Sequence, residues 1–195
     1  MLYQALEIIK DQVSTYLEDL GGAANMVVLE NIAKHDDPGT TGISDKVILS
    51  LVNLEEEVTL KNRSITKSEN GDPVYKNPPI HLNLYLLFAV NRSTYIQSLD
   101  TLGDVIEFFQ GKNYFNQANT VLNPANPALT GVTEFKFTAE LYTPTFEQLN
   151  YIWGTLGGKS LPSALYKITL ATVNRDATLG RTTRVSQTIT NANPI

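Results

Sequence analysis

Residues able to support catalysis are few and scattered in this sequence. The two histidines are His35 and His81, and cysteine is absent. Thiol catalysis, disulfide bonds and thiolate metal sites are therefore excluded, and the redox compartment stays undetermined. His35 lies beside Asp36 and Asp37 in a stretch rich in turn formers, where a metal would need further ligands from elsewhere. We interpret that stretch as an exposed turn, and His81, inside an apolar run, as a packed or hydrogen-bonded core residue.

One glycine-rich stretch, Gly154 to Ser160, reads GTLGGKS and resembles a phosphate-binding loop. That loop requires four residues between its first glycine and Gly-Lys-Ser, whereas three stand here. The phosphate loop also follows a strand and opens a helix, whereas this stretch follows a helical pattern. We therefore predict a helix end and a tight turn at this position.

The other common catalytic arrangements are also missing. No serine stands in a nucleophile-elbow pattern, and the serines lack an evident histidine partner. A pair of acids for glycoside hydrolysis is a matter of three-dimensional spacing and stays open, although nothing in the sequence argues for it. We predict a protein that is not an enzyme and that uses no cofactor and no metal.

Composition indicates that part of the surface is not meant to face water. The chain of 195 residues suits one domain, and 18% of its residues are charged, against about a quarter in typical proteins. A formal charge of −5 and a pI near 5.0 argue against a nucleic-acid partner. No segment reaches the roughly 18 apolar residues of a membrane span, and no export signal is visible. We expect a soluble protein with part of its surface covered by partners.

The stretch from Pro78 to Lys112 organises the predicted fold. Ile80 to Val90 is the most apolar run, and it follows two prolines, which favours a central strand buried on both sides. Ser93 or Thr94 then caps a helix that runs to about residue 110. Its apolar positions, which recur every three and four residues, are Tyr95, Leu99, Leu102, Val105, Ile106 and Phe109.

Around this unit the sequence predicts further elements from its hydrophobic periodicity. They are a helix from Leu2 to Leu20, strands at 26–32, 46–61, 135–141, 165–173 and 185–190, and a short helix at 145–154. Residues 62–79 are predicted to form a hairpin-like connection or loop, and 112–131 an irregular surface excursion. Glu55, Glu56 and Glu57 mark an exposed strand edge. The tail from Asn174 onward is too polar to bury much.

The predicted fold class is α/β or α+β, with a mixed sheet flanked by an N-terminal helix, a crossover helix and a short third helix. We assign residues 1–175 to one domain and 176–195 to a C-terminal arm.

Two segments of this chain resemble a known family. The first contains LNLYLLF at Leu82 to Phe88 and FFQ at Phe108 to Gln110, and the second contains LNYIW at Leu149 to Trp153 and PSALY at Pro162 to Tyr166. Both resemble the N-terminal domain of cap, or tail-terminator, proteins of phage-tail-like contractile injection particles. The motif residues that we assign to the core are Leu82, Leu84, Tyr85, Phe88, Tyr95, Leu99, Phe108, Phe109, Leu149, Trp153 and Tyr166.

The resemblance implies a structural role. Tail terminators form a six-membered ring on the end of the inner tube and the last sheath layer, stop polymerisation and anchor the sheath. It implies a homohexamer with sheath and inner-tube proteins as partners, without nucleic acid or membrane, assembled in the cytoplasm into a particle that is released. The candidate interface residues are Glu55, Glu56, Glu57, Asn113, Tyr114, Arg181 and Arg184. A baseplate or adaptor protein of the same particle, or a small enzyme with an unrecognised site, remains an alternative.

Overall fold

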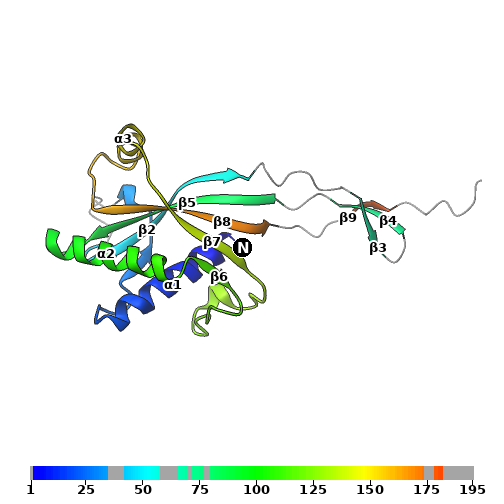
Figure 1. Cartoon of the computed structure of the whole chain (residues 1–195), viewed down its shortest axis with the longest axis horizontal. Helices are drawn as coiled ribbons and strands as arrows, with labels where there is room; N and C mark the ends of the chain where they lie inside the picture. The colour runs from blue at the N-terminus through cyan, green and yellow to red at the C-terminus, as the bar shows by residue number, and fades with distance from the viewer. Residues whose placement is uncertain are drawn as a thin grey trace, which may run out of the picture.

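The computed structural model describes residues 2–34, 42–57, 66–69, 72–76, 80–173 and 178–181. They form an α+β fold with two sheets, as Figure 1 shows. The helices are α1 (Leu2–Asp19), α2 (Tyr95–Gly111) and α3 (Phe146–Thr155). The strands are β1 (Val27–Leu29), β2 (Lys46–Glu56), β3 (Thr66–Glu69), β4 (Asp72–Lys76), β5 (Ile80–Asn91), β6 (Tyr114–Asn116), β7 (Lys136–Tyr142), β8 (Ser163–Val173) and β9 (Thr178–Arg181).

The larger sheet has the order β1-β2-β5-β8-β7-β6. β1 pairs with β2 in parallel, and every other pair in this sheet is antiparallel, so the predicted mixed sheet is confirmed. β5 lies between the two other long strands, with Phe88 opposite Leu49 of β2 and Ala164 of β8. The apolar run of β5 is therefore central and covered on both faces, as its sequence predicts.

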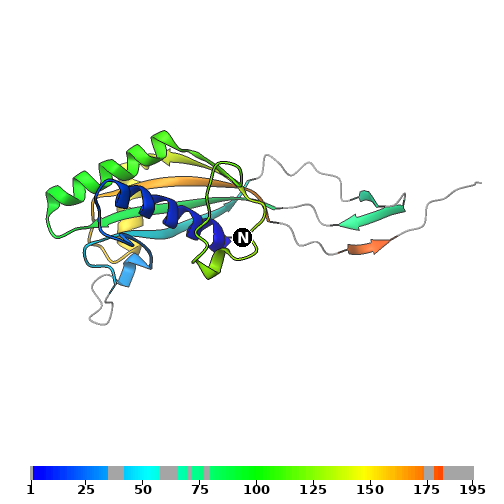
Figure 2. The same cartoon turned by 90° about the horizontal axis from the view of Figure 1, so that it is seen from below.

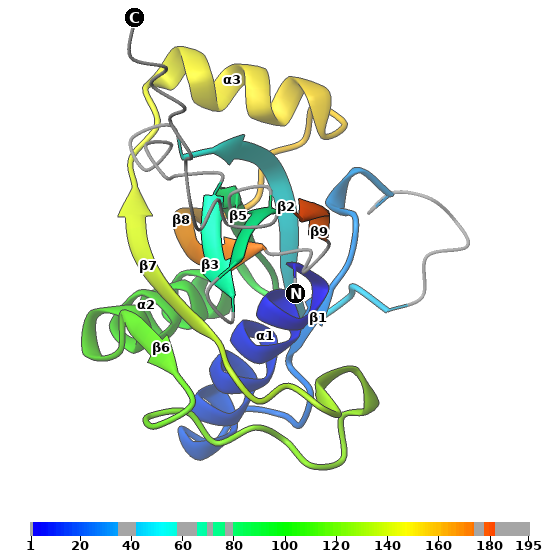
Figure 3. The same cartoon turned by 90° about the vertical axis from the view of Figure 1, so that its right-hand side faces the viewer.

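One face of this sheet carries α1 and α2, and the other carries α3 (Figures 1 and 3). Beneath α1 and α2 lies the larger core, in which the aromatic rings of Phe88, Phe109 and Tyr166 meet at centroid distances of 4.2 to 5.7 Å. Burial raises the pKa of Tyr166 to about 12. Beneath α3 the core is smaller and is built around Ile48, Leu87 and Trp153.

α2 begins where the sequence predicts, and the stripe through which it packs agrees with the predicted one only in part, at Leu102, Val105 and Phe109. The Thr94 side chain accepts a hydrogen bond from the Gln97 amide and caps the helix. The helix then buries Ser98, Thr101, Val105, Phe108 and Phe109 against the sheet and α1. The Ser98 hydroxyl donates to the Thr94 carbonyl, which satisfies this polar group inside the contact.

The expected place of Tyr95 and Leu99 in the core is wrong. Tyr95 is 69% exposed and Leu99 47% exposed, and Ile106 is exposed beside them. Apolar residues occur around more than half of this helix, so periodicity alone does not select the stripe that packs. The small side chains of Ser98 and Thr101 allow α2 to approach closely on their side, and this leaves Tyr95 and Leu99 facing outward.

Residues 112–131 are more ordered than the sequence predicts, because they include β6 and a short 3-10 helix at Pro127–Leu129. The side-chain amide of Asn126 donates to Glu7 at 2.8 Å and to Asp11 at 2.9 Å, both on α1. Lys10 pairs with the same Glu7 carboxylate. This network fastens the excursion to α1.

The smaller sheet has the order β3-β4-β9, and its β3–β4 hairpin lies within the predicted connection at 62–79. In Figures 1 and 2 it lies beyond one end of the larger sheet, at the opposite end from the start of α2. β9 belongs to the segment assigned to the C-terminal arm, and the strand predicted at 185–190 lies outside the described residues.

Candidate functional site

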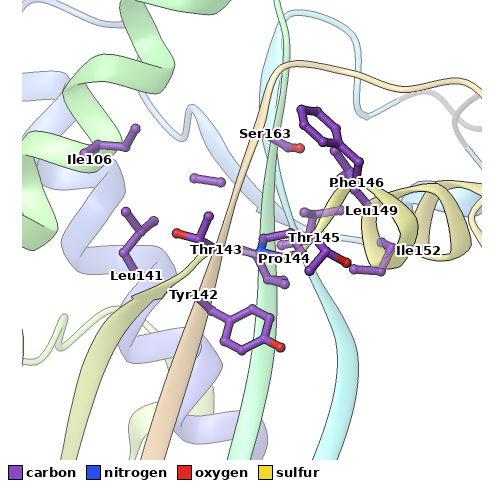
Figure 4. A pocket seen from close by; sticks show the side chains of 13 residues that line it. Ile106, Leu141, Tyr142, Thr143, Pro144, Thr145, Phe146, Leu149, Ile152 and Ser163 are labelled. Atoms are coloured by element: carbon purple, nitrogen blue, oxygen red, sulfur yellow. The ribbon is translucent and has the colours of Figure 1, made fainter.

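An apolar groove lies between α2 and α3, across the end of β7 (Figure 4). Its volume is about 580 Å³. The groove exists because β7 leaves the sheet at Tyr142, opposite Leu165, whereas β8 already begins at Ser163. The chain from Thr143 to Thr145 then crosses to α3, and the corner of the sheet beneath it remains open.

The start of α3 fixes the wall of this groove. The Thr145 hydroxyl accepts from the Gln148 amide, and the Gln148 side chain accepts from the Thr145 amide, which completes a capping box. This cap places Phe146, the first residue of α3, at the rim of the groove, where it is 93% exposed. Leu141, on the opposite side, is 55% exposed.

The lining of the groove is mainly apolar and is suited to binding an apolar surface. Ten of the thirteen lining residues are apolar or aromatic, and the other three are Thr143, Thr145 and Ser163. No carboxylate, amine or imidazole lines it, so it offers no charged anchor. Of the side-chain types that act as general acids or bases, the lining holds the phenol of Tyr142. Exposed apolar surface of this kind makes the groove a candidate contact surface.

The residues considered for chemistry do not form a site. His81 is 7% exposed, as predicted for a core residue, and its Nε2 has no hydrogen-bond partner. His35, Asp36 and Asp37 lie outside the described residues. In the part of the chain that the structure describes, no group of three or more metal-binding side chains occurs.

The stretch Gly154 to Ser160 ends a helix, as predicted. α3 stops at Thr155, and the Gly158 amide donates to the Trp153 carbonyl at 2.8 Å. Gly157 and Gly158 have φ values of 106° and 81°, which close the turn in the left-handed region. No helix begins after this turn, so the geometry of a phosphate-binding loop is absent here.

Most residues of the expected motif core lie inside the fold. The buried ones are Leu84, Phe88, Phe108, Phe109, Trp153 and Tyr166, and the half-buried ones are Leu82, Tyr85 and Leu149. With Tyr95 and Leu99 exposed, the stretch that resembles the family contributes both core and surface.

The candidate interface residues lie at different parts of the molecule. Glu55 accepts a hydrogen bond from Tyr85 at 3.0 Å, and Glu57 accepts one from Asn83 at 2.8 Å. Burial and the neighbouring Glu55 raise the pKa of Tyr85. Among the described residues, β1 covers β2 only as far as Leu49, so the Glu55 end of β2 is an open edge, as predicted.

On the opposite side of the sheet, Asn113 is exposed and its carbonyl accepts from the Ala139 amide at 2.7 Å. Tyr114 is half-buried, with the Lys136 ammonium 5.7 Å from its ring centroid. Arg181 ends β9, and Arg184 lies outside the described residues. The structure does not bring these residues together with Glu55, Glu56 and Glu57.

Sequence reasoning missed the groove. Its rim combines Ile106, Leu141 and Phe146, which come from three elements that meet only in the folded chain. The sequence of α2 did indicate exposed apolar surface, because this helix has more apolar residues than a single packed stripe can bury.

Comparisons with known proteins identify a family and a shared fold. The family described as the Pvc16 N-terminal domain matches residues 4–187. No curated protein matches the chain. A solved structure described as the sheath/tube terminator, in the extended state, of the extracellular contractile injection system PVC is similar over 100% of this chain, with a TM-score of 0.64 and 12% identity. The tube-terminating cap of the anti-feeding prophage is similar over 94%, with a TM-score of 0.56 and 14% identity.

At these identities the two structures establish a shared fold. The chain spans 64% of the first of these proteins and 58% of the second. No helix in the described residues is long and apolar enough to cross a bilayer.

Proposed function

This chain belongs to the Pvc16 N-terminal domain family, and from that membership we propose that it is a structural terminator of a contractile injection particle. The observation that carries the proposal is the family match over residues 4–187, and the likeness of fold to a sheath/tube terminator supports it. In this role six copies form a ring on the end of the inner tube and sheath, stop their growth and anchor the sheath. No catalytic step is part of this function.

The partners follow from the role. They are other copies of the chain, the inner-tube protein and the sheath protein, without nucleic acid or membrane. The particle is assembled in the cytoplasm and then released. Residues 1–175 form the terminator-like domain and 176–195 extend from it. The apolar groove is a surface for contact with another protein of the particle, because no charged side chain lines it and Phe146 stands at its rim.

The first experiment measures both assembly and capping. Sedimentation velocity gives the mass of the purified chain, and negative-stain microscopy gives the lengths of inner tubes polymerised with and without it. We expect a six-membered ring that sits on tube ends and shortens the tubes. A chain that ignores tube and sheath contradicts the proposal, and binding to baseplate proteins alone favours the adaptor alternative.

A pair of variants tests the groove. Phe146→Asp places a charge at its rim and is expected to weaken capping at least tenfold. Val121→Asp is the matched control, since Val121 is also exposed but lies in the 112–131 excursion, outside the groove. Equal capping by both variants removes the groove from the proposal.

A further inference from the structure

Charge is divided unequally along this chain. Segments 58–79 and 174–195 contain seven of the fifteen Lys and Arg residues but three of the twenty Asp and Glu residues. Their formal charge is therefore +4, whereas the rest of the chain carries −9 with histidine neutral. The described part of the basic segments is the sheet β3-β4-β9, which includes Lys67, Lys76 and Arg181. We call this sheet the basic sheet.

The basic sheet does not pack on its own body. Its strands contact one another extensively but make little or no contact with the described elements of the larger sheet or with the helices. Figures 1 and 2 place it beyond the end of the larger sheet. Three short strands with few apolar residues gain little by burial, and such a sheet is marginal without a covering surface.

The complementary charge lies on α2. Asp100, Asp104 and Glu107 follow one another at i, i+4 and i+7, and so form one stripe on the helix surface, which we call the acidic stripe. None of the three has an ion pair in the described part of the chain. By contrast, Glu55 and Glu57 already accept hydrogen bonds from Tyr85 and Asn83.

The acidic stripe repels itself. Burial raises the pKa of Asp104, and the charges of Glu107 and Asp100 raise it further. Burial raises the pKa of Tyr16 on α1, and the charges of Glu107 and Asp104 raise it further. Within the described residues no ion pair offsets this repulsion, so a cationic surface placed against the acidic stripe would lower its energy.

We propose that the basic sheet of one copy docks on the acidic stripe of a second copy. This inference rests on the ring proposed above and names a contact that joins its subunits. The second copy is the occupant because the excess of cations and the excess of acids belong to the same chain. The basic sheet lies toward one end of the long axis of the molecule, and α2, which carries the acidic stripe, lies toward the other (Figure 1). A contact between two different surfaces of identical subunits is head-to-tail, which is the arrangement that generates a ring when its rotation closes.

Charge reversal in the full-length chain tests the contact. One variant carries Asp100→Lys and Glu107→Lys, and another carries Lys67→Glu and Lys76→Glu. Both altered carboxylates are exposed, so the fold is retained. Sedimentation velocity should show that each variant raises the dissociation constant of the ring at least tenfold, and that the wild-type ring weakens with salt. Combining all four substitutions in one chain should restore the ring, because both surfaces are then reversed.

The matched control is Glu134→Lys with Glu140→Lys, which changes the net charge equally at exposed positions in or next to β7. It should leave the ring intact. Rings that form normally from both reversals, or a combined variant that stays dissociated, overturn the docking. Tube capping is scored separately, so capping without this contact leaves the terminator proposal standing. A wild-type chain that neither forms rings nor caps tubes overturns the terminator proposal itself, and this inference with it.

Discussion

The two faces of the larger sheet differ in how completely they are covered. On the α1 and α2 face, aromatic side chains from helices and strands form one continuous core. On the α3 face, a smaller cluster lies under one short helix, and the apolar groove remains open with Phe146 at its rim. The difference indicates that the first face contributes most of the core and the second leaves apolar surface exposed.

Removing a ring from the first face should have the largest effect. Phe109 contacts Phe88, Tyr166 and Phe108 at centroid distances of 5.3, 4.2 and 5.0 Å. We expect Phe109→Ala to lower the free energy of unfolding by about 3–5 kcal/mol. Urea unfolding measures this, and Phe146→Ala, on the open face, should change it by less than about 0.5 kcal/mol. Equal losses in the two variants would break the comparison.

The second largest loss of stability should follow from detaching the 112–131 excursion from α1. Asn126→Ala removes two hydrogen bonds to carboxylates and the side-chain oxygen that accepts from the Ala128 amide, and should cost about 2 kcal/mol. Burial acts to raise the pKa of Glu7, but hydrogen bonds from Lys10 and Asn126 and the charge of Lys10 hold it below its usual 4.5. The stability that Glu7 gains from these interactions is therefore fully present above pH 4.5, and it is lost as pH falls through the pKa of Glu7 in the folded chain.

Chemical unfolding at pH 7 and at pH 3 measures this prediction. The loss caused by Asn126→Ala should be smaller at the lower pH, because the Asn126 amide bonds more strongly to an ionised Glu7 carboxylate than to a protonated one. Asn123→Ala is the control, because Asn123 is exposed and its side chain accepts only from the nearby Ala125 amide. A loss that is the same at both pH values would exclude the carboxylate as its source.

On the α3 face, removal of the N-cap of α3 should cause a smaller loss of stability. Thr145→Ala removes the hydroxyl that accepts from the Gln148 amide and should cost about 1 kcal/mol. Phe146 follows Thr145 directly, so loss of the helix N-cap should also disturb the position of Phe146. We therefore expect the same variant to terminate inner tubes less well. Thermal unfolding measures the first effect and tube length the second, with Thr155→Ala, at the other end of the helix, as the comparison.

The smallest expected effect is a gain in stability, on removal of the charge of Asp104. The pKa of Asp104 is raised above its usual 3.8 by burial and by Glu107 and Asp100, so the folded chain holds this proton more tightly than the unfolded chain. Stability therefore falls as pH rises from 3.8 through the folded pKa. Asp104→Asn should stabilise the isolated subunit at pH 7 by about 0.2–0.5 kcal/mol, as for a like-charge helical pair. The gain should vanish below pH 3.8.

The covered part of the fold was largely predictable from sequence. The period of two in β7 and the apolar run of β5 are set by burial, and the cap residues Thr94 and Thr145 act on their own helices. Local signals of this kind place an element without knowledge of its neighbours. β6 was missed because three residues in a polar stretch carry no period.

The open surfaces were not predictable. Which stripe of α2 packs depends on how closely the sheet approaches Ser98 and Thr101, and this is decided by tertiary contacts. The groove depends on where β7 leaves β8, a matter of register between strands distant in sequence. The family resemblance gave the general role but located neither the groove nor the acidic stripe.

The strands that lead toward the basic sheet have a mechanical consequence. β2 ends, β5 begins and β8 ends at the same end of the larger sheet, with β5 in the middle (Figure 1). A pull on the basic sheet is therefore directed along these strands, and it loads the hydrogen bonds between them in shear, many at once. Only a pull perpendicular to the strands would break the hydrogen bonds between them one at a time. The subunit is thus built to resist tension along its long axis, the direction in which a docked neighbour would draw on it.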